Sequence, residues 1–571
     1  MFYSGKFIGD ERNAQDIKLA ALAQGLCSTA QLARIESGIR SAEKLLFDSL
    51  YERLGKNTER FTVLLNCDEY EQLVARIRIC DCIDNGQYEE AKKQIEEYKK
   101  TAKNNIHMQY ISLVECEVMH RAHTDIVKCM DKLAEGIGYT CPDFDIDNIS
   151  ECYLSRLEML IVQQYAVYIE QSGENDRAAG LYRDILEYLD SDRYDPVERA
   201  KLYGYVGYHL MKYYIERGQY DMALEVGEKT YGCVMNREKW LFVTELKAGI
   251  IECREAHGED MSGAKEILEI LQRMNDRYGV RRADDYFPRY AEEYAANAND
   301  VIRQRRARYG ITQEELAREI CDVTTISRLE NNRHNLNDEL RNRLLEKLNL
   351  SSDKYSPCTE GDFGDEMNRK LKKVSKAIKE GRYDKLAKLP DIGGDKAIDE
   401  AIGEALRRIE ALSKNSDGIL VFDNDWGIID DLVFYCEGSG GRDRIVLYGS
   451  MFRQACIDAM PYESGISGVL KNMEEGELLR ELGNVEAAGE KLTEAIKLAV
   501  KFDEFEWFSR LLYLYAQNIL ERMGECAAYR QAECIELLEY SYALACAYDD
   551  RRRIEAVRAL CGKYNLKARI E

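Results

Sequence analysis

The sequence predicts an all-α protein built from two similar halves, each a small helical domain followed by a longer array of helices. Six prolines in 571 residues, with long stretches rich in Ala, Glu, Lys, Leu and Arg, favour helices throughout. The stretch "ITQEELAREICDVTTISRLENN", residues 311–332, has the pattern of two short helices joined by a tight turn. Shifted back by 294 residues, it falls on "IKLAALAQGLCSTAQLARIESG", residues 17–38. A chain of this length is expected to hold several domains.

The first small domain, residues 1–56, is predicted from its match to residues 298–350. The pairs that coincide under the 294-residue offset include Leu22/Leu316, Ala23/Ala317, Cys27/Cys321, Leu32/Ile326, Ile35/Leu329, Leu50/Leu344 and Leu54/Leu348. These apolar positions are the ones that must meet inside a small helical bundle. Further on, "NGQYEEAKK" at residue 85 matches "EGRYDKLAK" at residue 380, at an offset of 295 residues. One offset for so many positions indicates a tandem duplication.

The first helical array, residues 57–297, is predicted from glycines that are each followed five residues later by alanine. The pairs are Gly86/Ala91, Gly173/Ala178, Gly218/Ala223 and, in the second half, Gly483/Ala488. Glycine permits a sharp turn between helices, and alanine lets the two helices pack closely. The pattern resembles the turn and second helix of tetratricopeptide repeats. Repeats of this kind stack into solenoids with a concave binding surface.

In the second small domain, residues 298–350, we expect a helix over 301–308, a second helix from Gln313 and a third over about 322–330. The ending "SRLEN" of the third helix resembles the Cro/repressor-type helix-turn-helix family, often called the XRE family, and the first small domain resembles it too. The two domains depart from the commonest form of this family, because Cys27 and Cys321 stand where glycine is usual in the turn.

The resemblance implies two sets of DNA contacts. It makes Gln313 a phosphate contact at the start of the second helix. It makes the first turn of the third helix the reader of base edges: Val323, Thr324, Thr325 and Arg328, with Thr29, Ala30, Gln31 and Arg34 as equivalents. Threonine and valine can meet a thymine methyl group, and glutamine and arginine can pair with purine edges. Two alternatives stay open: the arginines can form ion pairs with Glu330 and Glu36, and the threonines can cap the helix.

Charge separates the small domains from the rest of the chain. The net charge is −23, but residues 301–350 carry +2 and residues 1–56 carry +1, which leaves −26 for the remainder. Arg305 and Arg306 belong to an arginine-rich first helix in the second small domain, where some side chains are expected to face phosphates. The acidic remainder disfavours non-specific nucleic-acid binding.

A divergent tetratricopeptide-like helical domain is expected over residues 351–571. Within it, residues 418–449 contain the run Gly-Ser-Gly-Gly. The run lacks the G-K-[ST] ending of a phosphate-binding P-loop, so we interpret it as a flexible loop between helices.

Several function classes are disfavoured. Only six histidines occur, and no zinc-protease, nucleophile-elbow or Cys/His signature is present, so we do not expect an enzyme. The eighteen cysteines form no C-x-x-C pair, so we assign no metal and no cofactor and expect reduced, mostly buried thiols. No apolar run is long enough for a membrane span and the N-terminus lacks a signal-peptide core, which favours a cytoplasmic location.

The combined features resemble bacterial transcription regulators that join an XRE-type domain to a tetratricopeptide-like sensor. We therefore expect a sequence-specific regulator that binds double-stranded DNA and senses a peptide or protein ligand in a solenoid groove. Such a chain would act as a monomer with two reading domains or as a homodimer. One alternative is a protein-interaction scaffold or antagonist with degenerate helix-turn-helix domains. Another places one small domain on DNA and the other in a dimer interface.

Overall fold

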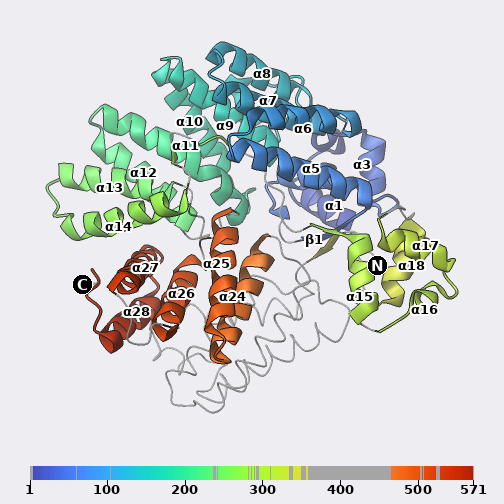
Figure 1. Cartoon of the computed structure of the whole chain (residues 1–571). Coiled ribbons are helices and arrows are strands. Elements are labelled where there is room, and N and C mark those ends of the chain that lie inside the picture. Colours follow the sequence, from blue (N-terminus) through green and yellow to red (C-terminus); the bar gives the residue numbers. More distant parts are fainter. Residues whose placement is uncertain are drawn as a thin grey trace, which may run out of the picture. The chain divides into compact units, whose positions relative to one another are not determined.

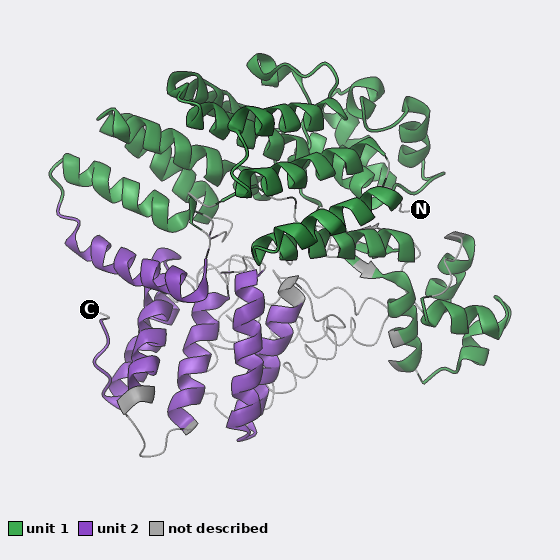
Figure 2. Ribbon diagram, turned by 45° about the horizontal axis from the view of Figure 1, so that its top comes forward, with its two compact units in different colours: residues 1–237, 241–259, 282–357 green, residues 238–240, 260–281, 358–571 purple. Residues whose placement is uncertain are grey.

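A computed structural model gives the fold of this chain in two compact units (Figure 2). Unit 1 comprises residues 1–237, 241–259 and 282–357, and unit 2 comprises residues 238–240, 260–281 and 358–571. The structure describes residues 4–58, 61–102, 104–235, 240, 242–280, 282–283, 286–288, 290, 295–308, 310–332, 338–348, 355–357, 465–501, 505, 507–522 and 528–569. The expected loop at 418–449 and the sequence match at residue 380 lie outside these ranges.

Unit 1 begins with the first small domain and contains the second. The first consists of α1 (Ser4–Ala14), α2 (Leu19–Ala23), α3 (Thr29–Glu36) and α4 (Lys44–Arg53), and the second of α15 (Ala298–Arg308), α16 (Gln313–Ala317), α17 (Val323–Glu330) and α18 (Asp338–Lys347). The predicted starts of the second and third helices in the second small domain are correct to within one residue. The apolar residues that the offset aligns form the two cores: Leu22, Leu32 and Leu50 are buried in one, and Leu316, Ile326 and Leu344 in the other.

Between the small domains, unit 1 carries the first helical array (Figure 1). Its helices are α5 (Cys67–Asp84), α6 (Tyr88–Thr101), α7 (Asn105–Arg121), α8 (Ile126–Gly138), the 3-10 helix η2 (Ile146–Glu151), α9 (Arg156–Gln171), α10 (Asn175–Leu189), α11 (Pro196–Glu216), α12 (Tyr220–Met235) and α13 (Val243–Ala256). Helices α5 and α6, α7 and α8, α9 and α10, and α11 and α12 pack as consecutive pairs.

The glycine-alanine pattern predicts the turns of three of these pairs correctly. Gly86, Gly173 and Gly218 adopt the left-handed backbone conformation (φ of 69°, 93° and 68°), which costs glycine little. The alanines five residues later are fully buried at the helix contacts. The pair α7–α8 was missed because His123, with φ of 56°, takes the left-handed position in its turn.

A small sheet in unit 1 is absent from the sequence prediction. It consists of β1 (Phe61–Leu65), β2 (Ala295–Asn297) and β3 (Tyr355–Pro357) in the order β2-β1-β3. The central strand β1 pairs parallel to β2, which leads into the second small domain, and antiparallel to β3, which follows that domain. The sheet therefore joins the two small domains through strands that are far apart in sequence.

Side-chain hydrogen bonds reinforce this connection beside the sheet. The side-chain amides of Asn297 and Asn299 each donate to the Asn332 side-chain oxygen over 3.3 Å. The Asn299 amide also approaches the Cys67 sulfur, at the start of α5, to 2.8 Å. Because Asn332 follows α17, these contacts attach the second small domain to the beginning of the first helical array.

Unit 2 contains α14 (Ser262–Tyr278), α24 (Gly465–Glu481), α25 (Val485–Lys501), α26 (Phe508–Arg522), α27 (Ala528–Ala547) and α28 (Arg551–Tyr564). The turn between α24 and α25 again has a left-handed glycine, Gly483, followed by the fully buried Ala488. Helix α14 packs on α27, where Arg273 and Arg277 pair with Glu539 and Glu536. The helical fold class predicted from the sequence is confirmed.

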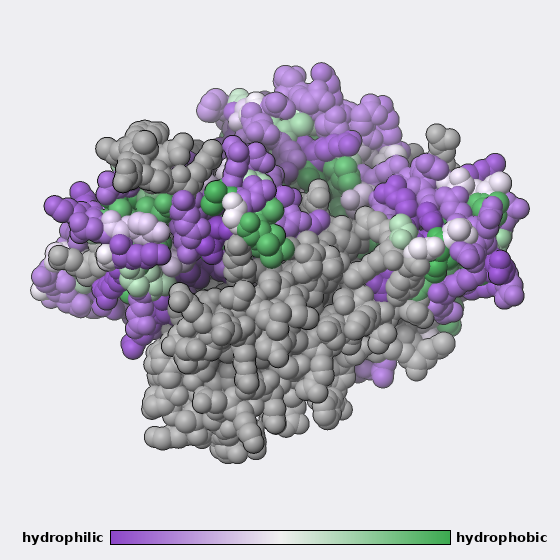
Figure 3. All heavy atoms as spheres, turned by 60° about the horizontal axis from the view of Figure 1, so that its bottom comes forward, coloured by the Kyte–Doolittle hydropathy of each residue, from purple (hydrophilic) through white to green (hydrophobic). Residues whose placement is uncertain are grey.

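The described surface is largely hydrophilic. On the face in Figure 3, hydrophobic residues of the described part show as small separate groups among hydrophilic ones. Within the described ranges no helix combines the length and apolarity needed to cross a membrane. All cysteines that the structure describes are free thiols.

Candidate nucleic-acid interface

The two small domains share unusual backbone conformations at equivalent positions. Three left-handed positions of the first have left-handed equivalents in the second under the 294-residue offset: Asp16/Gly310, Gly25/Glu319 and Gly38/Asn332. The residue that turns the chain between the second and third helices is thus Gly25 or Glu319. This left-handed position lies two residues before Cys27 and Cys321, so the cysteines that stand at the usual glycine position do not themselves need a left-handed backbone.

An equivalent ion pair closes each small domain. In the first, the Arg12 guanidinium bonds the Glu36 carboxylate over 2.7 and 2.9 Å and donates to the Ile17 carbonyl. In the second, Arg306 forms the same pair with Glu330 and donates to the Ile311 carbonyl over 2.7 Å. The hydrogen bond to the glutamate raises the pKa of each arginine. The pair fixes the end of the third helix against the first.

We expected three residues of this domain at phosphates: Arg305, Arg306 and Gln313. In the structure, two of them bond Glu330 and the third is buried. Arg306 is held by Glu330, with its side chain 18% exposed, and Arg305 is 6% exposed. The Gln313 side chain donates to the same Glu330 carboxylate over 2.7 Å. Sequence reasoning missed these contacts because they join residues 17 to 24 positions apart, beyond any local helical spacing.

The first turn of α17 forms an open surface. Val323 is 37% exposed, Thr324 and Arg328 are exposed, and Thr325 is half-buried. The helix cap is Asp322, which accepts hydrogen bonds from the Thr324 backbone N–H and hydroxyl over 2.8 and 2.6 Å. A carboxylate at the N-cap is a favoured way to satisfy the first N–H groups of a helix. The Glu330 carboxylate accepts hydrogen bonds from Arg306 and Gln313 rather than from Arg328.

The first turn of α3 presents a similar surface in the first small domain. Thr29, Ala30 and Arg34 are exposed and Gln31 is half-buried. The N-cap is Ser28, whose hydroxyl accepts from the Gln31 backbone N–H over 3.1 Å. Thr29 therefore does not cap the helix, and its side chain lies on the same face as the equivalent Val323.

The fourth helices of the two small domains make the same contact but differ in burial. In both domains, a basic side chain at the end of the fourth helix donates to carbonyls at the end of the second helix. Arg53 donates to the Leu22 and Gln24 carbonyls, and Lys347 donates to those of Glu315 and Arg318. Lys347 is exposed, whereas all ten residues of α4 are buried and the Arg53 side chain is 2% exposed.

Arg53 also fastens the first small domain to the helical array. Its guanidinium bonds the fully buried Glu158 of α9 over 2.5 and 3.1 Å and donates to the Thr140 carbonyl over 3.2 Å. Burial raises the pKa of Glu158, but the charge and hydrogen bonds of Arg53 more than offset this effect, so the pKa is lowered overall. Gly25 lies so close to Thr140 that an added Cβ would fall 1.8 Å from its carbonyl oxygen.

A second buried charge cluster lies where α4 meets the array. The Glu52 carboxylate is 3.3 Å from the Arg156 guanidinium and accepts from the Arg156 backbone N–H over 3.1 Å. Burial raises the pKa of Glu52 to about 8, with Arg156 opposing the shift and the carboxylates of Glu198 and Asp48 adding to it. The first small domain is thus integrated with the array through ionisable groups.

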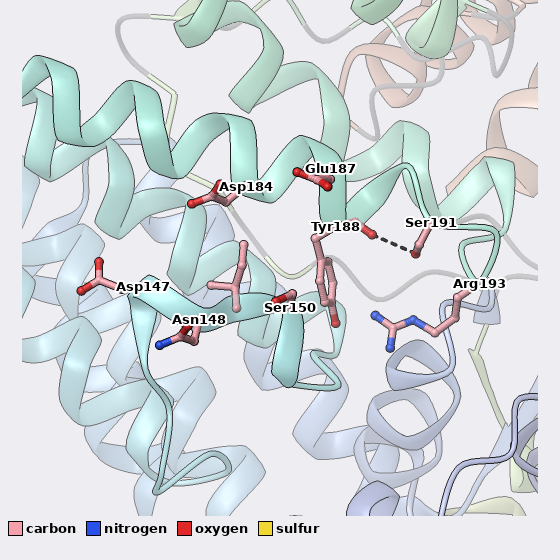
Figure 4. A pocket seen from close by; sticks show the side chains of 9 residues that line it. Asp147, Asn148, Ser150, Asp184, Glu187, Tyr188, Ser191 and Arg193 are labelled. Carbon is pink, nitrogen blue, oxygen red and sulfur yellow. Dashed lines mark hydrogen bonds between the residues drawn. The ribbon is translucent and has the colours of Figure 1, made fainter.

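A separate depression of about 500 Å³ lies between η2 and the end of α10 (Figure 4). Its lining is largely polar, with three acidic residues and one arginine: Asp147, Asn148, Ile149, Ser150, Asp184, Glu187, Tyr188, Ser191 and Arg193. The Ser191 hydroxyl donates to the Tyr188 carbonyl over 2.9 Å, and the Arg193 guanidinium stacks 4.8 Å from the Tyr188 ring.

Comparison with known proteins identifies the second small domain. Residues 302–355 match the helix-turn-helix family HTH_3, which is a family of DNA-binding-regulator type. No curated protein matches the chain. Among solved structures, Bacillus thuringiensis PlcR in complex with the peptide PapR7 and DNA is similar at 16% identity and a TM-score of 0.29, over 46% of this chain and 91% of that chain. The helix-turn-helix assignment rests on the family match and on the geometry of α15–α18.

Proposed function

We propose that this protein is a sequence-specific, DNA-binding transcription regulator with two reading domains on one chain. The observation that carries the proposal is the exposed first turn of α17 in a domain that matches the HTH_3 family. Val323, Thr324, Thr325 and Arg328 are our candidate base readers there. Their side chains suit thymine methyl groups and purine edges in the major groove.

The first small domain is proposed as a second reader with a different preference. Its equivalent face offers Thr29, Ala30, Gln31 and Arg34, so only threonine and arginine recur between the two sets. The matching left-handed positions and ion pairs support a common origin by duplication. Two domains that share backbone conformations and an ion pair but differ in their exposed residues would read half-sites that are not identical.

The sheet supports an inverted rather than a direct arrangement of these half-sites. Under the 294-residue offset, Phe61, Thr62 and Val63 of β1 correspond to Tyr355, Ser356 and Pro357 of β3. The antiparallel register pairs Phe61 with Pro357, Thr62 with Ser356 and Val63 with Tyr355. Exchanging the two copies leaves this pairing unchanged, so it has a local twofold axis at the Thr62–Ser356 pair. A twofold relation between reading helices matches an inverted repeat in DNA.

The test is selection of genomic DNA fragments by the purified full chain at low salt. It is repeated with the double variants Thr325→Ala/Arg328→Ala and Gln31→Ala/Arg34→Ala. We expect discrete sites with two half-sites, and each double variant should lose sequence preference at one half-site. Selection of no fragment by a folded wild-type chain would refute the proposal and favour a protein-interaction scaffold.

One observation favours a mixed function as the second candidate. The fourth helix of the first small domain is wholly buried and tied to the array through Arg53 and Glu158. A domain held in this way can serve as a structural part of the array while the second small domain alone binds DNA. In the same selection, loss of all sites in the Thr325→Ala/Arg328→Ala variant and none in the Gln31→Ala/Arg34→Ala variant would support this alternative.

A further inference from the structure

The exposed start of α17 carries a negative charge directly beside the proposed base readers. Asp322, the N-cap residue of α17, is exposed, as are the next two residues, Val323 and Thr324. Hydrogen bonds from Thr324 lower the pKa of the Asp322 carboxyl, and the charge of Arg328 lowers it further. The carboxylate is therefore ionised at neutral pH. A surface proposed to enter the major groove thus begins with an anion, although like charges make DNA phosphates repel it.

The Asp322 carboxylate also limits what Thr324 can offer to DNA. A threonine hydroxyl has one hydrogen to donate and two lone pairs that accept, whereas an ionised carboxylate only accepts. The Thr324 hydroxyl donates its hydrogen to Asp322 Oδ1 over 2.6 Å, and the Thr324 backbone N–H donates to the same oxygen over 2.8 Å. The side chains of both residues therefore present acceptors to an incoming base and no donor.

The equivalent position of the first small domain has a different chemistry. Under the 294-residue offset, Asp322 and Thr324 correspond to Ser28 and Ala30. The Ser28 hydroxyl caps α3 by accepting from the Gln31 backbone N–H over 3.1 Å, and a hydroxyl that accepts in this way still has a hydrogen to donate. Serine and aspartate are about equally favoured as N-caps. Capping alone therefore does not explain why the second domain has a carboxylate here.

A surface that only accepts hydrogen bonds distinguishes the four bases in the major groove. Cytosine presents an amino donor there, guanine presents two acceptors, thymine presents one acceptor and a methyl group, and adenine presents a donor beside an acceptor. One acceptor on the protein can meet the cytosine amino group, and the neighbouring cytosine C5–H has no lone pair to oppose the other. Guanine, thymine and adenine each place a lone pair against a protein oxygen, which excludes them by repulsion.

We propose that Asp322, together with Thr324, makes the second reading domain require a cytosine where the start of α17 meets the major groove. The first reading domain, with Ser28 and Ala30, has no such requirement. This inference rests on the proposed function, because it names the base chemistry that the domain reads. Arg328 lies four residues after Thr324, on the same face of the helix, and supplies the positive charge that offsets the repulsion between Asp322 and phosphates.

The test uses the full chain and one DNA fragment that the wild-type protein selects. Every base pair of both half-sites is replaced in turn by the other three, and dissociation constants are measured for wild type and for Asp322→Ser. At one position of one half-site, replacing a cytosine should weaken wild-type binding at least about tenfold. In Asp322→Ser this loss should shrink to about twofold or less at that position and stay unchanged elsewhere, because only a residue and base in contact are coupled.

Two further variants separate base reading from charge and from folding. Glu346→Ser removes another exposed carboxylate, on α18, and should change the affinity for all fragments alike while leaving the cytosine preference intact. Asp322→Asn keeps a favoured cap but adds amide hydrogens that can donate. It should therefore tolerate a purine at the position where wild type requires cytosine. Urea unfolding of all three variants checks that the domain remains folded.

The outcomes distinguish this inference from the proposed function. Fragments selected by the wild-type chain, with the same base preferences in Asp322→Ser at every position, would overturn the inference and leave the proposed function intact. A preference for a base other than cytosine at the affected position would overturn it as well. Selection of no DNA by a folded wild-type chain would instead refute the proposed function, and the inference with it.

Discussion

Individual arginines in the second small domain have separable roles. Arg306 and Arg328 are both basic and close in space to the proposed DNA face, and the sequence assigns both to DNA. The structure gives Arg306 to the Glu330 carboxylate, with a side chain 18% exposed, and leaves Arg328 exposed. Sequence could place both residues on helices but could not reveal the ion pair, because its partners are 24 residues apart.

This difference predicts opposite results for two alanine variants. Arg306→Ala leaves the 5% exposed Glu330 side chain without its charge partner and should lower the free energy of unfolding by about 2 kcal/mol. Arg328→Ala should leave stability within about 0.5 kcal/mol of wild type and weaken DNA binding. Chemical denaturation and DNA binding are measured on both proteins. Equal destabilisation by the two variants would show that Arg328 is structural.

The Glu52 carboxylate predicts a pH dependence of stability. Its pKa is raised to about 8 in the folded protein, mainly by burial, against about 4.3 in an unfolded chain. Between these values the folded state holds a proton that the unfolded state has lost, so stability falls as pH rises from about 4.3 to 8. Glu52→Gln removes this contribution. We expect the variant to gain at least about 1 kcal/mol on wild type between pH 5 and pH 7 in urea unfolding, at 1.36 kcal/mol per unit. A constant difference across this range would contradict the raised pKa.

At the scale of single elements, the turn between the second and third helices distinguishes the two small domains. Gly25 has φ of 69° and Glu319 has φ of 66°, a conformation that L side chains rarely adopt. Glu319→Gly should therefore raise stability by about 0.5–1 kcal/mol. Gly25→Ala should lower stability by more than about 2 kcal/mol, because its Cβ would also meet the Thr140 carbonyl. Thermal unfolding of both variants checks the signs, and stabilisation by Gly25→Ala would exclude this turn geometry.

The ends of the fourth helices provide another matched pair. Arg53 and Lys347 make equivalent hydrogen bonds, but only Arg53 also neutralises a buried glutamate. Removing one partner of a buried ion pair typically costs about 3–5 kcal/mol. A cation at an exposed helix terminus contributes less than about 1 kcal/mol. Arg53→Met should therefore destabilise unit 1 far more than Lys347→Met in denaturant titrations. Similar losses would show that the Glu158 contact contributes little.

Helices were predictable from sequence where a local signal exists. The Gly-to-Ala spacing found three turns of the first array and one in unit 2, because it reports a left-handed residue and a close helix contact within six residues. The α7–α8 turn was missed because a histidine holds the left-handed position. The strand β1 was missed because its partners lie more than 200 residues away. The buried setting of α4 was missed because its partners Thr140 and Glu158 lie 87 and 105 residues away, beyond any local pattern.

At the scale of the whole chain, the proposal of two reading domains on one polypeptide predicts the stoichiometry of DNA binding. A single chain should saturate one site that contains two inverted half-sites, without a second copy. Sedimentation of the complex with a selected fragment measures this ratio. Reversing one half-site to make a direct repeat should abolish the contribution of that half-site. Equal affinity for inverted and direct repeats would contradict the twofold arrangement of the reading helices that we propose from the β1–β3 register.

The position of β1 also bears on how the chain folds as it is synthesised. Phe61–Leu65 leaves the ribosome more than 200 residues before its partners, which begin at Ala295 and Tyr355. At typical rates of about 5–20 residues per second, the strand waits on the order of tens of seconds before either partner exists. An apolar strand with two open edges is a site for mispairing during that interval. The nascent chain therefore exposes this apolar strand until Ala295–Asn297 has been made.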